Sequence, residues 1–111
     1  MSKPLLSIAM PVFNAGMFLR DSVLSIIHQT VDNWELLIID DGSTDNSIDS
    51  IKDLLNDRIR IFRDGANKGL AVRLNEAVNL AQGKFIARMD QDDISYPGRL
   101  EKQLHALAED Q

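Results

Sequence analysis

The sequence predicts a three-layer α/β/α sandwich built around a mostly parallel sheet. Four apolar, strand-like runs begin near Leu5, Trp34, Ile59 and Lys84, so successive starts lie 29, 25 and 25 residues apart. Each interval has room for one strand, one crossover helix and two loops. Apolar residues at helical spacing follow every run, and no linker interrupts the alternation. This alternation is typical of Rossmann-like sheets with helices on both faces.

The first two units predict the centre of the sheet. The runs "LLSIAMPV" and "WELLIID" are almost continuously apolar, as expected of parallel strands that are covered on both faces. Helical spacing after these runs places Leu19, Val23, Ile26 and Ile27 on one shared face, and Ile48, Ile51 and Leu55 on another. Each set can therefore cover the neighbouring strands.

The last two units are more polar. In "RIRIFR", Ile59 and Ile61 alternate with arginines, and this short run favours a place near an edge of the sheet. The fourth run continues into "FIARMDQDD". Helical spacing after these two runs places Ala71, Leu74, Val78 and Ala81 on one face, and Leu100, Leu104 and Leu107 on another.

Composition restricts the classes of function. The 111 residues suffice for one domain with a real core, and the apolar fraction of 44% is ordinary for a globular protein. The net charge is −5 and there is no basic stripe, which argues against nucleic acid or an anionic membrane as a partner. There is no cysteine for a thiolate metal site, and no membrane-spanning run. We expect this portion of the protein in the cytoplasm.

Ligands bind beyond the carboxyl ends of the strands in such sheets, and the unusual residues of this chain follow those ends. The first end, "MPVFNAG", lacks the G-x-G-x-x-G of dinucleotide binding and the P-loop motif. Pro11 and Phe13 can offer backbone groups and a flat edge to a base, although a turn with Phe13 packed beneath it explains the same residues. The second end, "IIDDGSTD", directs Asp40 or Asp41 into the cleft, either to accept a hydrogen bond from a heterocycle N–H or to bond loop amides.

The third and fourth units add a cation and an acidic cluster. Asn67 lies in the third loop and Arg73 in the following helix, where it can pair with a diphosphate or with neighbouring acidic residues. At the fourth end, Asp90, Asp92 and Asp93 are crowded together, although two carboxylates about 4 Å apart repel by roughly 1–4 kcal/mol. On an extended segment Asp90 and Asp92 project to the same side, and oxygen ligands without His or Cys select Mg²⁺ or Mn²⁺. A divalent cation with a phosphorylated ligand would offset the repulsion.

As a set, these motifs resemble a family 2 glycosyltransferase with the GT-A fold. The resemblance runs in order through "SIAMPVFNAGMFLRDSVLSIIHQT", "WELLIIDDGSTDNS", "NKGLAVRLNEAV" and "GKFIARMDQDDISYPGRLEKQ", and it covers nearly the whole chain. It implies metal-dependent transfer of a sugar, with inversion, from a nucleotide diphosphate sugar to an acceptor hydroxyl. A UDP-sugar is the implied donor, a sugar, glycan or lipid-linked molecule is the implied acceptor, and cell-surface polysaccharide synthesis is the implied process.

The resemblance also implies which residues bind the donor. Pro11 and Phe13 would line the base and ribose of the nucleotide. Asp41 would accept a hydrogen bond from the uracil N–H. Asn67 and Arg73 would help to hold the nucleotide and its diphosphate.

The acidic cluster matches the D-x-D motif of the family. The resemblance implies that Asp90 lies towards the ribose or a metal-bound water and that Asp92 binds Mn²⁺ or Mg²⁺ directly. Asp93 is an alternative metal ligand, because some relatives shift register here. The catalytic base of the family normally lies well after this motif, so none of the residues present is expected to be the base. The chain is therefore interpreted as the N-terminal donor-binding domain, residues 1–111, of a longer glycosyltransferase, inactive in transfer by itself.

Two other classes of protein share parts of this pattern. A haloacid-dehalogenase-type phosphotransferase also uses Asp-x-Asp at a strand end, but at the first strand and followed by Thr or Val. A non-enzymatic receiver-like module has an acidic Mg²⁺ pocket, but its acidic pair follows strand one and its lysine follows strand five. Here the motif follows the fourth run and precedes Asp93. The order of the motifs favours the glycosyltransferase.

Overall fold

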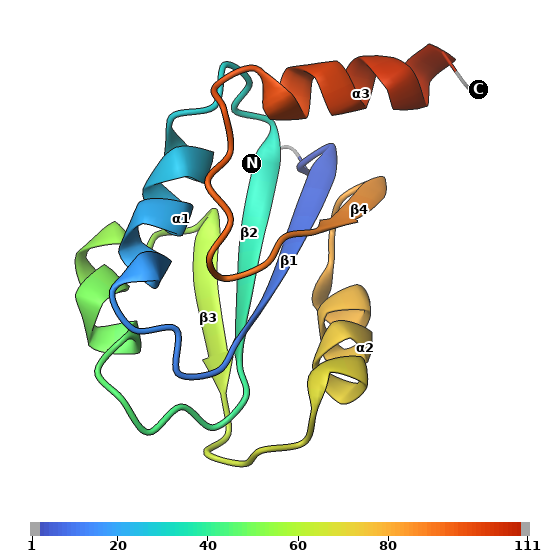
Figure 1. The fold of residues 1–111 in the computed structure, drawn as a ribbon. Coiled ribbons are helices and arrows are strands. Elements are labelled where there is room, and N and C mark those ends of the chain that lie inside the picture. The colour runs from blue at the N-terminus through green and yellow to red at the C-terminus, as the bar shows by residue number, and fades with distance from the viewer. Residues whose placement is uncertain (1–2, 110–111) are drawn as a thin grey trace.

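The computed structural model describes residues 3–109 of the chain (Figure 1). Along the chain the elements are β1 (Leu6–Val12), α1 (Phe18–Ile27), β2 (Trp34–Asp40), η1 (Ile48–Leu54), β3 (Ile59–Arg63), α2 (Leu70–Leu80), β4 (Phe85–Arg88) and α3 (Arg99–Glu109). The four predicted strands are confirmed, and each begins within one residue of its predicted start. The second helix is a 3-10 helix, η1.

The sheet is entirely parallel, with the strand order β3-β2-β1-β4. β1 and β2 are central, and the predicted edge position of β3 is confirmed for the described sheet. Successive connections move outward from β1 to β3, and the chain then returns to place β4 on the other side of β1. The order of the strands thus reverses beside β1. In open α/β sheets a crevice forms at such a switch point, outside the carboxyl ends of the strands.

Helices cover both faces of the sheet, which confirms the three-layer α/β/α architecture. Figure 1 shows α1 and η1 on one side of the strands and α2 on the other. The larger part of the core lies under α1 and η1 and includes Met10, Leu19, Ile26, Leu36, Ile38 and Ile51. The smaller part lies under α2 and consists of Ala9, Leu37, Ile39 and Ala77, with Phe62, Leu74 and Ala81 packed against it.

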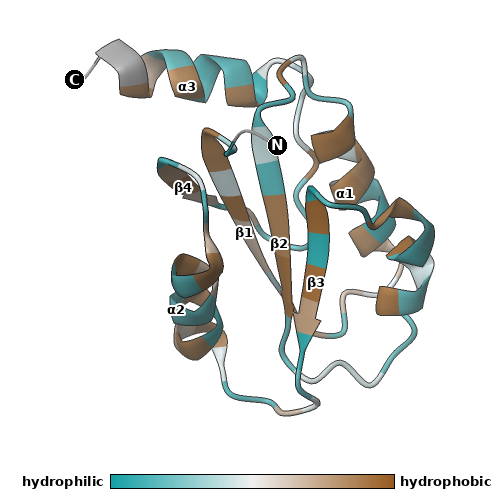
Figure 2. Cartoon of the chain, turned by 180° about the vertical axis from the view of Figure 1, so that it is seen from behind, coloured by the Kyte–Doolittle hydropathy of each residue, from teal (hydrophilic) through white to brown (hydrophobic). Residues whose placement is uncertain are grey.

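The hydropathy of the strands agrees with their positions. β1 and β2 are apolar along most of their length, whereas polar residues interrupt β3 (Figure 2). Residues on both faces of β2 are buried, as expected of a central parallel strand. Within residues 3–109, no helix has the length and apolar character needed to cross a membrane.

The buried face of α2 differs from the predicted one. Arg73 and Ala77 are the fully buried residues of this helix, whereas Val78 is 57% exposed. Ala71 is also exposed, and so is Leu107 in α3. The prediction is confirmed for Leu74 and Ala81, which pack against the smaller core, and wrong for Ala71 and Val78. An apolar spacing of three and four residues does not decide which line of a helix faces the sheet. In α2 that line contains the long side chain of Arg73, whose burial sets the rotation of the helix.

Candidate functional site

A hollow of about 320 Å³ opens at the carboxyl ends of the strands. It is lined by Pro11, Val12, Phe13, Asp41, Leu70, Arg73, Arg88, Asp90, Gln91 and Asp92. These residues come from the ends of β1, β2 and β4 and from the start of α2. Six of the residues singled out in the sequence thus meet in one place, at the switch point beside β1. Asn67 and Asp93 lie next to the hollow and do not line it.

Phe13 forms part of the wall of the hollow. Its side chain is 45% exposed, so it does not pack beneath a turn. The next residue, Asn14, has a φ of +47°, and its side-chain oxygen accepts a hydrogen bond from the Thr44 N–H at 2.8 Å. This contact ties the loop after β1 to the loop after β2. The exposed ring is therefore held on an anchored loop.

Asp40 and Asp41 point to opposite faces of the sheet. Asp40 is fully buried on the side of α1, where its Oδ2 accepts from the Ser43 N–H at 3.2 Å and lies 3.8 Å from Nε of Arg63. Asp41 lines the hollow. The sequence did not show which of the two aspartates lies in the site. Because successive side chains at the end of β2 point to opposite faces, Asp41 is the one that reaches the hollow.

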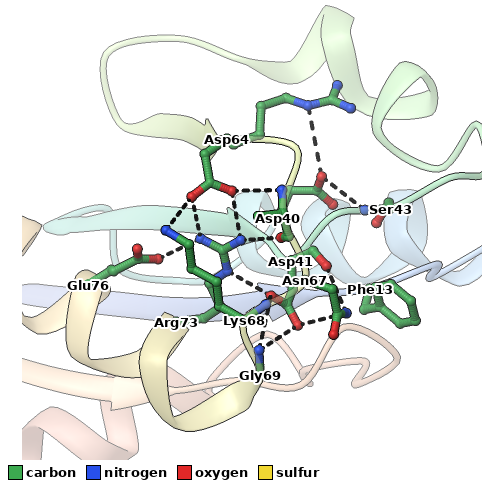
Figure 3. Close-up of polar contacts among 12 residues, drawn as sticks. Phe13, Asp40, Asp41, Ser43, Asp64, Asn67, Lys68, Gly69, Arg73 and Glu76 are labelled. Atoms are coloured by element: carbon green, nitrogen blue, oxygen red, sulfur yellow. Dashed lines mark hydrogen bonds and ion pairs between the residues drawn. The ribbon is translucent and has the colours of Figure 1, made fainter.

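The Asp41 carboxylate is held by the loop that precedes α2 (Figure 3). Its Oδ1 accepts from the Lys68 N–H at 2.7 Å and from Nε of Arg73 at 2.8 Å, and its Oδ2 accepts from the Gly69 N–H at 3.2 Å. The Lys68 N–H above all, together with the Arg73 guanidinium, lowers the pKa of Asp41. Asp41 therefore bonds loop amides and also presents an ionised carboxylate to the hollow.

Gly42 allows this loop to approach Asp41 closely. Its φ is +82°, and a Cβ atom at this position would lie 2.9 Å from the carbonyl carbon and oxygen of Ala66. Only glycine fits both the backbone conformation and the space. Asn67 adds a further contact, because its Nδ2 donates to the backbone oxygen of Asp41 at 3.1 Å and to Oδ2 at 3.2 Å. Asn67 thus supports Asp41 from outside the hollow.

Arg73 lies between three acidic side chains (Figure 3). It is 2% exposed, and besides Asp41 its guanidinium donates to Oδ1 and Oδ2 of Asp64 at 2.8 and 3.2 Å and to Oε1 of Glu76 at 2.9 Å. The remaining N–H donates to the Ala66 carbonyl. The hydrogen bonds that Arg73 donates to Asp64, Glu76 and Asp41 raise the pKa of Arg73, and those that Asp64 accepts from Arg73 lower the pKa of Asp64. All five N–H groups of the guanidinium are therefore paired within the protein.

The acidic cluster forms a turn after β4. The Asp93 N–H donates to the Asp90 carbonyl at 3.1 Å, and Oδ2 of Asp93 accepts from the Asp90 N–H at 3.2 Å. The prediction of an extended segment at Asp90 was wrong. β4 and its pairing with β1 end at Arg88, and the chain turns after that residue. Asp90 and Asp92 nevertheless both line the hollow, and Asp93 is used to close the turn.

Gln91 was not singled out in the sequence, but it joins two walls of the hollow. Its Oε1 accepts from the Phe13 N–H at 2.8 Å, and its Nε2 donates to the Phe13 carbonyl at 3.3 Å. Its own backbone oxygen accepts from Oγ of Ser22 in α1 at 2.7 Å. The middle residue of the D-x-D motif therefore fixes the acidic turn to the loop after β1 and to α1.

A polar stripe, formed by α1 and the residues directly after it, holds the chain that follows this turn. The buried residues Ser22, Ser25 and Gln29 are spaced by three and four positions. Oγ of Ser25 accepts from the Ser95 N–H at 3.0 Å, and Gln29 accepts from the Leu100 N–H at 2.9 Å. Polar residues at helical spacing beside a predicted buried face were the signal from which this anchor could have been found.

The side chains of the hollow fit a hard divalent cation. Asp90 and Asp92 are oxygen ligands, and Asp92 makes no hydrogen bond or ion pair with any residue between 3 and 109. Over the same range no group of three or more His, Cys, Asp and Glu residues is placed to hold a metal. Mg²⁺ commonly takes only one or two protein carboxylates and completes its shell with water and phosphate. Asp92, with Asp90 beside it, is therefore the best available anchor.

Comparison with known proteins decides the family. The chain matches the family described as glycosyl transferase family 2 over residues 7–111. The chain belongs to this family. An Escherichia coli relative, UDP-Glc:alpha-D-GlcNAc-diphosphoundecaprenol beta-1,3-glucosyltransferase WfgD, is 39% identical over 103 residues, which are 93% of this chain and 41% of that protein. The chain spans less than half the length of the curated glycosyltransferases that it matches.

Solved structures of glycosyltransferases share the fold. S. aureus TarS, residues 1–349 in complex with UDP-GlcNAc, superposes with a TM-score of 0.86 at 22% identity, over 94% of this chain and 31% of that one. The mannosyltransferase PcManGT from Pyrobaculum calidifontis, in complex with GDP-Man and Mn²⁺, superposes with a TM-score of 0.71 at 21% identity, over 82% of this chain and 28% of that one. The GT-A fold of this glycosyl transferase family 2 chain is thereby shown. The comparisons support neither the phosphotransferase nor the receiver-like module.

Proposed function

We propose that the chain is the donor-binding domain of a metal-dependent glycosyltransferase that takes its sugar from a UDP-sugar. The acceptor is a hydroxyl of a sugar, a glycan or a lipid-linked molecule, and the anomeric carbon is inverted. We further propose that the enzyme acts in cell-surface polysaccharide synthesis, at the cytoplasmic side of the membrane. The names of WfgD and of the TarS and PcManGT complexes support a nucleotide sugar as the donor, and that of WfgD supports a lipid-linked acceptor.

One observation carries this proposal: an exposed aromatic wall, an ionised carboxylate and a pair of acidic side chains face a single hollow. Phe13 offers a flat apolar surface to a base, and Asp41 is already held in place to accept a hydrogen bond from a base N–H. Because the loop amides fix Asp41 before any ligand binds, little reorganisation is needed on binding.

Asp92 and Asp90 would hold the metal ion beside the diphosphate of the donor. A bound Mn²⁺ or Mg²⁺ supplies Lewis-acid neutralisation of the negative charge that develops on the leaving nucleotide diphosphate. The protein's own contribution here is to orient the donor and to concentrate charge at one end of the hollow. We place the catalytic base in a further, C-terminal part of a longer enzyme, so the chain alone is proposed to bind nucleotide without transferring sugar.

Isothermal titration calorimetry tests the proposal. UDP, GDP and dTDP are titrated into the chain with Mn²⁺ and with EDTA, and the series is repeated with Asp92→Asn. We expect UDP to bind most tightly, Mn²⁺ to strengthen its binding, and the substitution to weaken the Mn²⁺-dependent binding by about tenfold, or about 1.4 kcal/mol. Asp93→Asn is the matched control, because Asp93 closes the turn and does not line the hollow. Equal binding by wild type and Asp92→Asn in Mn²⁺ would contradict the metal assignment.

A further inference from the structure

We propose that Arg88, the last residue of β4, is the residue that binds the diphosphate of the nucleotide ligand in this hollow. The proposal rests on the proposed nucleotide-binding function and assigns to Arg88 the charge pairing that the sequence had suggested for Arg73. Among the described residues that line the hollow, Arg73 and Arg88 are the two cations. Their surroundings decide which of them can take a ligand.

Arg73 is committed to the protein. Its side chain is 2% exposed, and its five N–H groups already bond Asp41, Asp64, Glu76 and the Ala66 carbonyl. A phosphate oxygen could bind its guanidinium only by displacing one of these acceptors. That exchange would leave a partly buried carboxylate without its cation, which is strongly unfavourable.

Arg88 has donors to spare. Its side chain is 49% exposed, and both Nε and Nη2 lie 3.1 Å from the same atom, Oδ1 of Asp90. Its Nη1 makes no hydrogen bond with any residue between 3 and 109. A guanidinium has five N–H groups in a fixed fork, so Arg88 can keep its contact with Asp90 and still present a second edge to a ligand.

The charge pattern of the hollow favours an anion at this edge. Asp41, Asp90 and Asp92 would repel a diphosphate, but Arg88 already offsets the charge of Asp90 at the ion-pair distance. Paired phosphate oxygens match the planar fork of an arginine, which binds them through two parallel N–H bonds. The Asp90 contact also limits the motion of the Arg88 side chain, which reduces the entropy lost on binding.

Arg63 provides a closely matched control. It is the last residue of β3 as Arg88 is of β4, its side chain is also 49% exposed, and it lies 3.8 Å from Asp40 at the end of the neighbouring strand. Arg63 does not line the hollow. Replacement of either arginine by glutamine removes one charge at the carboxyl edge of the sheet, so a general electrostatic effect would be common to both variants.

The experiment uses wild type, Arg88→Gln, Arg88→Lys and Arg63→Gln. Uridine, UMP and UDP are titrated into each with Mn²⁺ and with EDTA, and Mn²⁺ alone is titrated in a separate series. We expect Arg88→Gln to weaken UDP binding by about tenfold and uridine binding by less than about twofold, so that the preference for UDP over uridine falls. Arg88→Lys should give an intermediate loss, because lysine keeps the charge without the fork. Arg63→Gln should leave both affinities unchanged.

Other results would overturn the assignment. If Arg88 only neutralises Asp90, Arg88→Gln will tighten the binding of Mn²⁺ alone and leave the ratio of UDP to uridine affinity unchanged. An equal loss in Arg88→Gln and Arg63→Gln would show a general effect of charge. Thermal unfolding of each variant identifies any loss of affinity that follows from misfolding. If Arg88→Gln is misfolded, Arg88→Lys is used in its place to test the assignment. If wild type binds none of the three ligands, the proposed function itself fails, and this assignment fails with it.

Discussion

The Gln91 side chain holds the backbone of Phe13 by two hydrogen bonds. Oε1 accepts from the Phe13 N–H at 2.8 Å, and Nε2 donates to the Phe13 carbonyl at 3.3 Å. Gln91 lies between the two carboxylates proposed to anchor the cation, and Phe13 is the wall proposed to contact the base. A single amide therefore joins the two parts of the hollow that must act on one ligand, although they lie 78 residues apart in the sequence.

Removal of this amide should weaken nucleotide binding without unfolding the chain. Gln91→Ala loses both bonds, and Gln91→Glu keeps an acceptor for the N–H while placing an oxygen against the Phe13 carbonyl. We expect either variant to bind UDP about three- to tenfold more weakly in Mn²⁺, and to lose less than about 1.5 kcal/mol of stability because these bonds are exposed. Gln103→Ala, at an exposed position of α3, is the control. Unchanged UDP affinity in Gln91→Ala would show that the contact does not position the ligand-binding walls.

The close approach at Gly42 predicts an unusually costly substitution. Gly42 and Gly65 both have positive φ values, +82° and +78°, but a Cβ at Gly65 would meet nothing within 4 Å, whereas one at Gly42 would lie 2.9 Å from the Ala66 carbonyl. Gly65→Ala should therefore show only the backbone strain, roughly 1–2 kcal/mol. Gly42→Ala should cost clearly more, because the loop that holds Asp41 must move. Urea unfolding of the two variants measures the difference, and equal costs would contradict the steric argument.

The polar stripe of α1 predicts a buried hydrogen bond of measurable value. Oγ of Ser25 accepts from the Ser95 N–H, which lies in the chain between the acidic turn and α3. Ser25→Ala leaves this buried N–H without its acceptor and should lower the free energy of unfolding by about 1–3 kcal/mol. Faster hydrogen exchange at Ser95 would accompany the loss. Ser50→Ala is the control, because the Ser50 hydroxyl donates only locally, to the Ser47 carbonyl. This substitution should lower the free energy of unfolding by less.

The fold could be predicted from the sequence because its signals are local. Strand starts, the parallel sheet and the edge position of β3 follow from apolar runs that alternate with helical spacing, and the rule for parallel sheets then places the site at their carboxyl ends. The convergence of Phe13, Asp41 and Asp92 on one hollow followed from this topology. Each step needed only residue types and their order.

The hydrogen-bond partners within the site could not be predicted in the same way. Arg73 was expected at the diphosphate, but its neighbours in space are Asp41 and Asp64, which approach only after β2, the loop and α2 have packed together. The role of Gln91 likewise depends on a contact between the ends of two different strands. A turn replaced the expected extended segment at Asp90 because one residue, Asp93, supplies the closing carboxylate. The hydrogen-bond partners of a side chain in the site are thus set by tertiary packing, and the residue type alone does not specify them.

The carboxylates around Arg73 predict how stability depends on pH. Hydrogen bonds lower the pKa of Asp64, through Arg73 first, and the pKa of Asp41, through the Lys68 N–H first. In the unfolded chain an aspartate has a pKa of about 3.9, so on acidification the unfolded state takes up these protons before the folded state does. The stabilisation is therefore complete above the unfolded value and is lost as the pH falls towards the lower folded values.

Urea unfolding from about pH 7 to about pH 3 tests this dependence. Wild type should lose stability steeply in the acid range. Asp64→Asn should be less stable than wild type at neutral pH, because Arg73 loses a charged partner, and its stability should fall less steeply below about pH 4, because one carboxylate with a lowered pKa is absent. The two curves should therefore converge in acid. Parallel curves would mean that Asp64 is not coupled to folding through the Arg73 network.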